Sequence, residues 1–188
     1  ANKVDTMLMV AAILTPNIIY SGTADSKDTI EGTDTFSAHD LKRLSTLLEA
    51  NKAKAVAGAE GNYICLVHPY QYYDLLNDAD WVAAAQYEGS KKIFRGYVGT
   101  YMNIDVLRTN NVPSQLNAAS PGTRVYKAIA FGARAMGLAW GLPWTWREKI
   151  SSYGEMVGIG SDSWVFAALL NSDYIWMGMS GATDPNVS

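Results

Sequence analysis

The sequence predicts a mixed α+β fold, and three segments carry that prediction. Residues 37–52 place leucines on one face of a helix. Residues 63–67 form a short apolar run between turn residues, which suits a buried strand. Residues 97–109 alternate apolar and other side chains with the period of two that a strand requires. At 188 residues, the chain is long enough to bury a core as one domain.

The first 36 residues predict a helix followed by an exposed loop. Apolar residues recur at helical spacing over residues 4–14, and Thr15-Pro16 should end that helix because proline disfavours helical geometry in the residue before it. Residues 21–36 are rich in Gly, Ser, Thr and Asp, as loops are. We therefore divide the chain into residues 1–36 and a core of residues 37–188, which forms one structural unit with two lobes.

The helix that opens the core has the clearest signals. The Ser37 hydroxyl is placed to cap the amide of Asp40, three residues on. One apolar face follows, made of Leu41, Leu44, Leu47 and Leu48. After the strand 63–67, residues 71–76 read as a helix that turns Tyr72, Leu75 and Leu76 inward. A short helix over residues 81–87 follows, capped by Asp78 or Asp80.

The second half is predicted to consist mainly of strands. The run 97–109 reads as one long strand, and residues 144–146 read as extended. Trp164 lies in an apolar run and is expected to be buried. The remaining elements are a strand at 124–131, an alanine-rich helix at 133–138, and a closing hairpin of strands 164–170 and 174–179.

Composition excludes several classes of protein. The net charge is −3 and the basic residues are scattered, which argues against tight nucleic-acid binding. No apolar run approaches the roughly 20 residues that a membrane span needs. The only cysteine, Cys65, lies in an apolar run and is expected to be buried and inert. A charged fraction of 18% with 6 Trp and 11 Tyr favours burial against partners, and would also fit a carbohydrate-binding module.

No set of residues assembles a catalytic or metal site. His68 precedes Asp74 by six residues, which leaves a hydrolase as an alternative, but neither a GxSxG motif nor a recognisable cysteine motif accompanies it. Asp74, Asp78 and Asp80 are the one acidic concentration, and helix capping accounts for them. The glycines have neither of the spacings typical of nucleotide-binding loops. We predict no catalytic residue, no cofactor and no metal.

Several segments, taken in order, resemble one family of viral shell proteins. They are the helix 36–44, the run Tyr63–Pro69 leading to Asp74-Leu75 and Trp81, Gly96–Gly99 before the strand 102–107, the run Ala128–Ala135, and residues 160–171. This ordered set resembles the major capsid proteins of tailed bacteriophages, in the family named after phage N-four, with the Hong Kong ninety-seven type fold. The resemblance implies the core of a peripheral and an axial domain. The chain has no obvious room for that family's N-terminal arm and extended loop, and it has Val165 where the family has a basic residue.

The resemblance implies a structural role rather than an enzymatic one. Many copies would form pentamers and hexamers of an icosahedral virion shell, made in the bacterial cytoplasm, around double-stranded DNA that is contacted weakly. Scaffolding or decoration proteins are further candidate partners. The shell of an encapsulin-like compartment is the alternative within the same fold. We expect interface anchors among the aromatic residues at loops and element ends, namely Trp81, Tyr87, Tyr101, Trp144 and Trp146.

Overall fold

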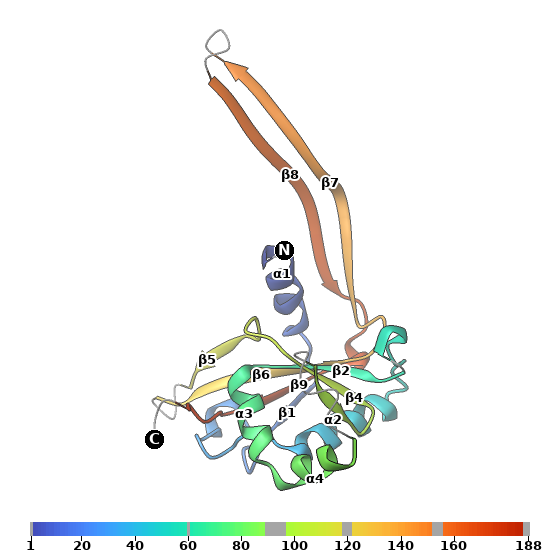
Figure 1. Ribbon diagram of the computed structural model, residues 1–188, viewed down its shortest axis with the longest axis vertical. Coiled ribbons are helices and arrows are strands. Elements are labelled where there is room, and N and C mark those ends of the chain that lie inside the picture. The colour runs from blue at the N-terminus through green and yellow to red at the C-terminus, as the bar shows by residue number, and fades with distance from the viewer. Residues whose placement is uncertain (1, 60, 89–96, 118–121, 152–155, 186–188) are drawn as a thin grey trace.

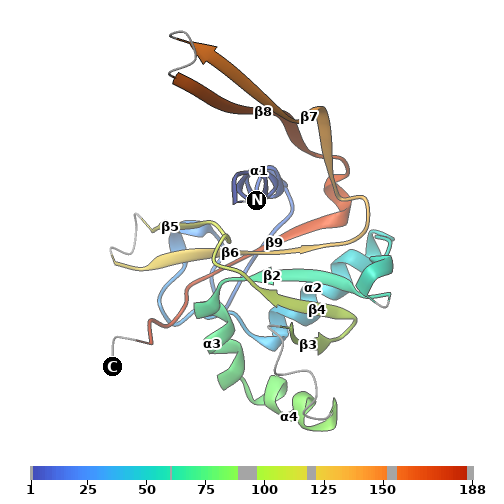
Figure 2. The same cartoon turned by 45° about the horizontal axis from the view of Figure 1, so that its top comes forward.

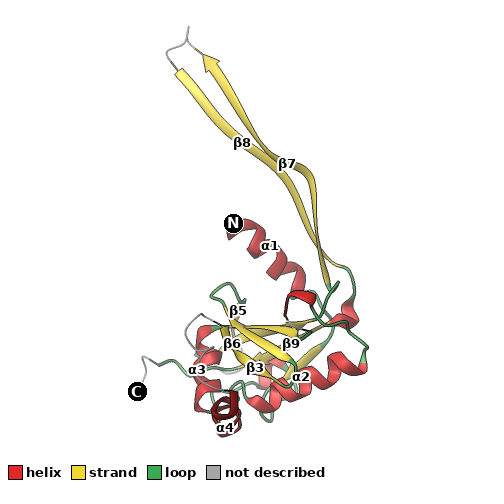
Figure 3. Cartoon of the chain, turned by 45° about the vertical axis from the view of Figure 1, so that its right-hand side comes forward, coloured by secondary structure: helices red, strands yellow, loops and turns green. Residues whose placement is uncertain are grey.

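The computed structural model consists of a helix-covered sheet from which a long two-stranded ribbon projects (Figure 1). It describes residues 2–59, 61–88, 97–117, 122–151 and 156–185. The two strands of the ribbon run side by side away from the body in every view (Figures 1 and 3).

The described α-helices all lie in the first half of the chain and most strands in the second half, a segregation that is typical of an α+β fold. The α-helices are α1 (Asn2–Ala12), α2 (Ala38–Ala50), α3 (Pro69–Asn77) and α4 (Ala79–Glu88). The strands of the body are β1 (Ile18–Tyr20), β2 (Tyr63–Val67), β3 (Tyr97–Tyr101), β4 (Ile104–Arg108), β5 (Ser114–Leu116), β6 (Arg124–Phe131) and β9 (Ile175–Ser180). The ribbon consists of β7 (Met136–Ser151) and β8 (Met156–Leu169). Short 3-10 turns lie at Lys27–Thr29, Ala57–Ala59 and Ser172–Tyr174.

The seven-stranded sheet is mixed, with strand order β1-β9-β6-β2-β4-β3 and with β5 paired to β6. The pairs β1–β9 and β2–β4 are parallel, whereas β6 is antiparallel to both β2 and β9. The ribbon forms a separate antiparallel pair. The predictions for the strands 63–67 and 124–131 are confirmed at both ends.

Helix α2 covers one face of the sheet and forms the main core. Leu41, Leu44 and Leu48 are fully buried there, packed in one cluster with Ala128 and Ala130 of β6. Ser37 and Asp40 form the predicted capping box at the start of this helix. The Asp40 carboxylate accepts hydrogen bonds from the Ser37 backbone N–H at 3.1 Å and from the Ser37 hydroxyl at 3.3 Å. The helix therefore begins where the sequence predicts, and the Asp40 carboxylate supplies one half of the capping box.

The opposite face of the sheet is covered by α1 and by the loop of residues 21–36. Ile129 of β6 points to this face, where it packs in one cluster with Met9 and Ala12 of α1. Ile30 of the loop is fully buried against Val125 of β6. The loop is thus less exposed than its composition predicts, because it supplies part of the second layer of the core.

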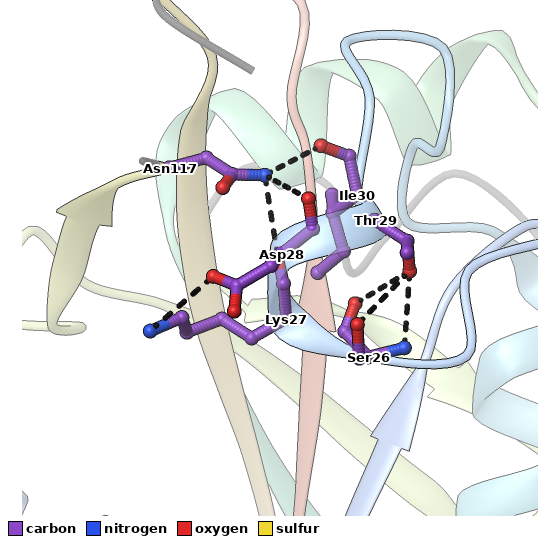
Figure 4. Close-up of polar contacts among 6 residues, drawn as sticks. All are labelled: Ser26, Lys27, Asp28, Thr29, Ile30 and Asn117. Atoms are coloured by element: carbon purple, nitrogen blue, oxygen red, sulfur yellow. Dashed lines mark hydrogen bonds and ion pairs between the residues drawn. The ribbon is translucent and has the colours of Figure 1, made fainter. Parts of the chain in front are cut away.

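Asn117 fixes that loop to the body (Figure 4). Its side-chain amide is buried and donates to the carbonyl oxygens of Lys27, Asp28 and Ile30, at 3.3, 3.2 and 2.9 Å. Without Asn117, the three carbonyl oxygens at this 3-10 turn would lose these hydrogen bonds. A single side chain from the segment after β5 therefore holds the turn and positions Ile30 in the core.

The run 97–109 is a hairpin and not one long strand. Met102 and Asn103 both have left-handed backbone geometry, with φ of 48° and 61°, and they form the two-residue turn between β3 and β4. The Ser45 hydroxyl of α2 donates to the Met102 carbonyl at 2.7 Å and supports the turn. The alternation of apolar and other side chains continues through the turn, so this pattern alone does not show that the chain reverses direction there.

The predictions for residues 133–138 and for the closing hairpin are wrong. In place of a helix, Arg134 takes a left-handed φ of 64° and the Ala133 N–H donates to the Lys54 carbonyl at 2.7 Å, after which β7 begins. The strands at 164–170 and 174–179 exist, but they do not pair with each other. β8 pairs with β7, and β9 pairs with β6 and β1.

Two side chains also lie on the opposite side from their prediction. Trp164 is 72% exposed, because it lies on the ribbon rather than in the body. Leu76 of α3 is exposed, while Gln71 takes the buried position and donates to the Ser180 hydroxyl at 2.8 Å.

Replacing Asn117 with alanine should lower the free energy of unfolding by about 1–3 kcal/mol, because three carbonyls lose their donor. Urea denaturation followed by tryptophan fluorescence measures this. Leu116→Ala is the matched control, since its side chain is 65% exposed and its loss should cost less than about 0.5 kcal/mol. Equal stability of the two variants would contradict the assigned role of Asn117.

The Cys65 thiol should be unreactive in the folded protein. Complete burial raises its pKa to about 12, so almost no thiolate exists at pH 8. A thiol-reactive chromophore should label Cys65 at pH 8 only after the chain is unfolded in denaturant. Rapid stoichiometric labelling of the native protein would show that this strand is not buried.

Candidate assembly surface

His68 has a structural role at the start of α3. Its Nδ1 accepts a hydrogen bond from the Tyr70 N–H at 3.2 Å, and its ring stacks on Tyr126 with centroids 4.5 Å apart. Burial, and secondarily the Arg124 guanidinium, hold the pKa of His68 below its ordinary value. Its proposed partner Asp74 instead accepts from the Thr183 N–H at 3.0 Å. No hydrogen bond joins His68 to Asp74.

Asp78 and Asp80, two members of the acidic cluster, have structural roles at the starts of helices. The Asp78 carboxylate accepts from the Ala38 N–H at 2.8 Å and from the Asp80 N–H at 2.9 Å, so it caps the starts of two helices. Asp80 in turn pairs with Lys42 at 2.8 Å. Within the described residues, His, Cys, Asp and Glu side chains do not gather into a group of three that could hold a metal ion.

The ribbon has one apolar and one polar face in its outer half. Strands β7 and β8 keep regular register from Thr145, opposite Asp162, to Ile150, opposite Val157. Because paired residues share a face and successive residues alternate, the faces can be assigned from the register. The apolar ribbon face consists of Trp146, Ile150, Val157 and Ile159, with Glu148 and Ser161 among them. The polar ribbon face consists of Thr145, Arg147, Lys149 and Asp162, with Gly158 and Gly160.

The apolar ribbon face is open to solvent in the single chain. The exposed fractions of its four large side chains lie between 59% and 75%. On the polar ribbon face, Arg147 Nε lies 2.7 Å from the Asp162 carboxylate, and both side chains are solvated. A largely exposed row of large apolar side chains backed by charges is typical of a surface that another molecule covers.

A second exposed apolar surface lies at the base of the ribbon. Figures 1 and 2 show α1 rising beside the ribbon on the same side of the sheet. A groove of about 520 Å³ lies between α1 and the inner end of β8, and its lining is largely apolar. Met7, Val10 and Leu14 line one side, and Phe166 of β8 lines the other.

The structure separates the five aromatic residues expected at interfaces. Trp144 and Trp146 lie on β7 and are 59% and 75% exposed. Trp81 is buried in the core beside the half-buried Tyr101, with ring centroids 5.7 Å apart. Tyr87 lies in α4, but its side chain is outside what the structure describes. Only the pair on β7 is thus shown to present large exposed rings.

Sequence reasoning missed the rest of the ribbon surface, although a signal exists. Trp146 and Ile150 alternate with Arg147 and Lys149, and Val157 and Ile159 alternate with glycines. This period-two pattern on both sides of a short connection is the pattern of an amphipathic hairpin.

No helix among the described residues combines the length and apolar character needed to cross a bilayer. A comparison with curated proteins found no match. Among solved structures, the capsid of Ralstonia phage GP4 is 27% identical, with a TM-score of 0.72 over 92% of this chain and 54% of that one.

Two further capsids share the fold at lower identity. The acid-stable capsid of Helicobacter pylori bacteriophage KHP30 is 13% identical, with a TM-score of 0.67 over 95% of this chain and 66% of that one. The capsid of cyanophage P-SCSP1u is 17% identical, with a TM-score of 0.62 over 95% and 60%. The chain therefore spans between about half and two thirds of the length of these capsid chains. A family model described as phage capsid protein matches residues 10–167, so the chain belongs to the phage capsid protein family and is a structural shell protein.

Proposed function

We propose that this chain forms the shell of a tailed-phage virion, as pentamers and hexamers of an icosahedral capsid that encloses double-stranded DNA. The observation that carries the proposal is the ribbon, which presents a row of exposed apolar side chains far from the body that carries it. A shell built from many copies needs such projecting contact surfaces, and the family is one of structural shell proteins.

The net charge of the chain fits a shell that encloses nucleic acid better than a protein that binds nucleic acid tightly. A net charge of −3 gives little electrostatic attraction to phosphates, so contacts with DNA should be weak and independent of sequence. Weak contact leaves the genome free to enter and leave the shell. Scaffolding or decoration proteins, and synthesis in the bacterial cytoplasm, belong to the same proposal.

We place the interface anchors at Trp144 and Trp146. Both rings are large, and they are 59% and 75% exposed on β7. Trp81 belongs to the core of the body, and Tyr101 lies against it with the Lys42 ammonium 5.9 Å from its ring. These two rings stabilise the body and are not needed to explain assembly.

Changing Trp144 and Trp146 together to alanine should reduce assembly much more than folding. Loss of one anchor of this kind costs about 2 kcal/mol of binding, or roughly 30-fold in the association constant. The free energy of unfolding should change by less than about 0.5 kcal/mol, because both side chains are exposed. Light scattering with negative-stain electron microscopy on the full chain gives the shell yield, and urea denaturation gives the stability.

Lys149→Ala is the control for that pair, since it lies on the same strand and on the polar ribbon face. Its shell yield should stay close to that of the unaltered chain. Unchanged shell yield in the double tryptophan variant would remove these anchors from the interface. A clean monomer from the unaltered full chain would contradict the proposed shell itself.

A further inference from the structure

Helix α3 begins at a histidine that stands where a serine, asparagine or aspartate cap is usual. His68 is the N-cap residue, Pro69 is the first residue of the helix, and His68 Nδ1 accepts a hydrogen bond from the Tyr70 N–H at 3.2 Å. The Gln71 side chain completes the cap, because its Oε1 accepts from the His68 N–H at 3.1 Å. The cap is thus reciprocal, and one half of it depends on an imidazole nitrogen.

This half of the cap exists only while His68 is neutral. A neutral imidazole has one nitrogen that accepts and one that donates, whereas both nitrogens of an imidazolium carry a proton. The bond at Nδ1 therefore places the proton of neutral His68 on Nε2. Protonation would replace the acceptor at Nδ1 with a second N–H that points at the Tyr70 N–H. Serine and asparagine caps have no such dependence on pH.

Three features around His68 disfavour its protonated form. Partial burial of the ring, and then the charge of Arg124 on β6, lower the pKa of His68. The helix dipole acts in the same direction, because His68 lies at the N-terminus of α3, which carries partial positive charge. An imidazolium here would thus be poorly placed even before the loss of its hydrogen bond is counted.

The other titratable groups beside His68 cannot restore the cap. The Tyr126 ring of β6 stacks on the imidazole, and the Tyr70 ring of α3 meets it edge-on with centroids 5.1 Å apart. Asp184, in the segment after β9, lines the same cavity of about 630 Å³ as His68. A π-face and a carboxylate both attract a cation, but neither offers an acceptor to the Tyr70 N–H at the helix start.

Helix α3 holds the segment that follows β9 at two points. Gln71 is buried and its Nε2 donates to the Ser180 hydroxyl at 2.8 Å. The Asp74 carboxylate accepts from the Thr183 N–H at 3.0 Å. Because Gln71 belongs both to the cap and to the contact with Ser180, the state of the helix start acts directly on this segment.

We propose that His68 acts as a pH-sensitive latch on the body of this protein. Protonation of the imidazole removes the cap of α3, frays the first turn of the helix and weakens its hold on the segment after β9. This inference goes beyond the proposed function and does not depend on it, because every group that takes part belongs to a single chain. In an assembly, every copy would respond over the same range of pH.

The stability of the body should therefore fall as the pH falls below about 6.5, the ordinary pKa of histidine. In that range the unfolded chain takes up a proton at His68 that the folded chain resists, so unfolding becomes more favourable. A folded state that never took up this proton would raise the unfolding equilibrium constant about 25-fold between pH 7 and pH 5. Because the ring is partly exposed, we expect a rise of several-fold.

Replacing His68 with asparagine tests the latch, because the asparagine oxygen accepts the same hydrogen bond and does not titrate. Urea denaturation of the unassembled chain at pH 7 and pH 5 should show a several-fold smaller loss of stability in His68→Asn than in the unaltered chain. His39→Asn is the matched control, since the chain has 2 histidines and His39 is exposed in the first turn of α2. This control should keep the acid sensitivity of the unaltered chain. Equal acid sensitivity in His68→Asn would overturn the latch.

Hydrogen exchange followed by mass spectrometry locates the effect within the body. After correction for intrinsic exchange rates, residues 69–77 and 180–185 should lose protection at pH 5 in the unaltered chain and keep it in His68→Asn. Strands β2 and β6 should keep their protection in both proteins. Loss of protection spread evenly over the body would overturn the link between His68 and these two segments.

Proton NMR supplies a test that needs no substitution at His68. The His39→Asn variant leaves one histidine ring signal, which belongs to His68. This signal should titrate at lower pH in the folded chain than in the same chain unfolded in urea. Titration at the same or a higher pH in the folded chain would overturn the latch, even if His68→Asn does not fold.

Discussion

The antiparallel pairing of β6 with β9 determines where everything else in this molecule lies. Six residue pairs join the two strands, from Tyr126–Ser180 to Phe131–Ile175. β7 begins shortly after β6 ends, and β8 ends shortly before β9 begins, so the pairing brings the two ends of the ribbon together. The Ala135 carbonyl accepts from the N–H groups of Leu170 and Asn171 and closes the base. The body thereby sets the direction in which the ribbon leaves it.

The ribbon is weakly stabilised because it projects away from the core of the body. Two strands satisfy each other's backbone hydrogen bonds, but an isolated two-stranded ribbon is marginal in water. The Arg147–Asp162 pair is solvated, and an exposed ion pair contributes less than about 1 kcal/mol. Packing of the apolar ribbon face against another molecule would contribute about 25 cal/mol of stabilisation for each Å² of apolar surface removed from water. Contact with a neighbour should therefore stabilise the ribbon itself as well as the assembly.

The sequence predicts the body of this fold better than its extension, for a physical reason. The helix α2 and the strands β2 and β6 each bury a face in their own chain, so their apolar period reflects their packing. The hairpin at Met102 and Asn103 was missed because neither residue is a glycine, although both take left-handed geometry. Trp164 was expected in the core because an apolar strand residue usually is buried. Here Trp164 lies on the ribbon and is 72% exposed.

The same reasoning explains the partial success with the interface residues. Trp144 and Trp146 were selected as aromatics at element ends, and the structure exposes both on β7. Trp81 was selected on the same ground, yet it is buried. Whether each ring is buried depends on what α4 and β7 pack against, which no local pattern records. An aromatic residue indicates that a large surface is buried, but not whether its own chain buries it.

A function carried by extended contact surfaces would also explain why it leaves no compact site in the described part of this chain. His68, Asp74 and Asp78, the residues with the chemistry of a site, are engaged in starting helices and holding loops. The surfaces left open are narrow and lie roughly 40 Å apart on one molecule. Ordering the ribbon on contact offsets part of the binding free energy, so a single contact is weak. A closed ring gains one such contact per copy with no open end, which makes the completed assembly more stable than any of its parts.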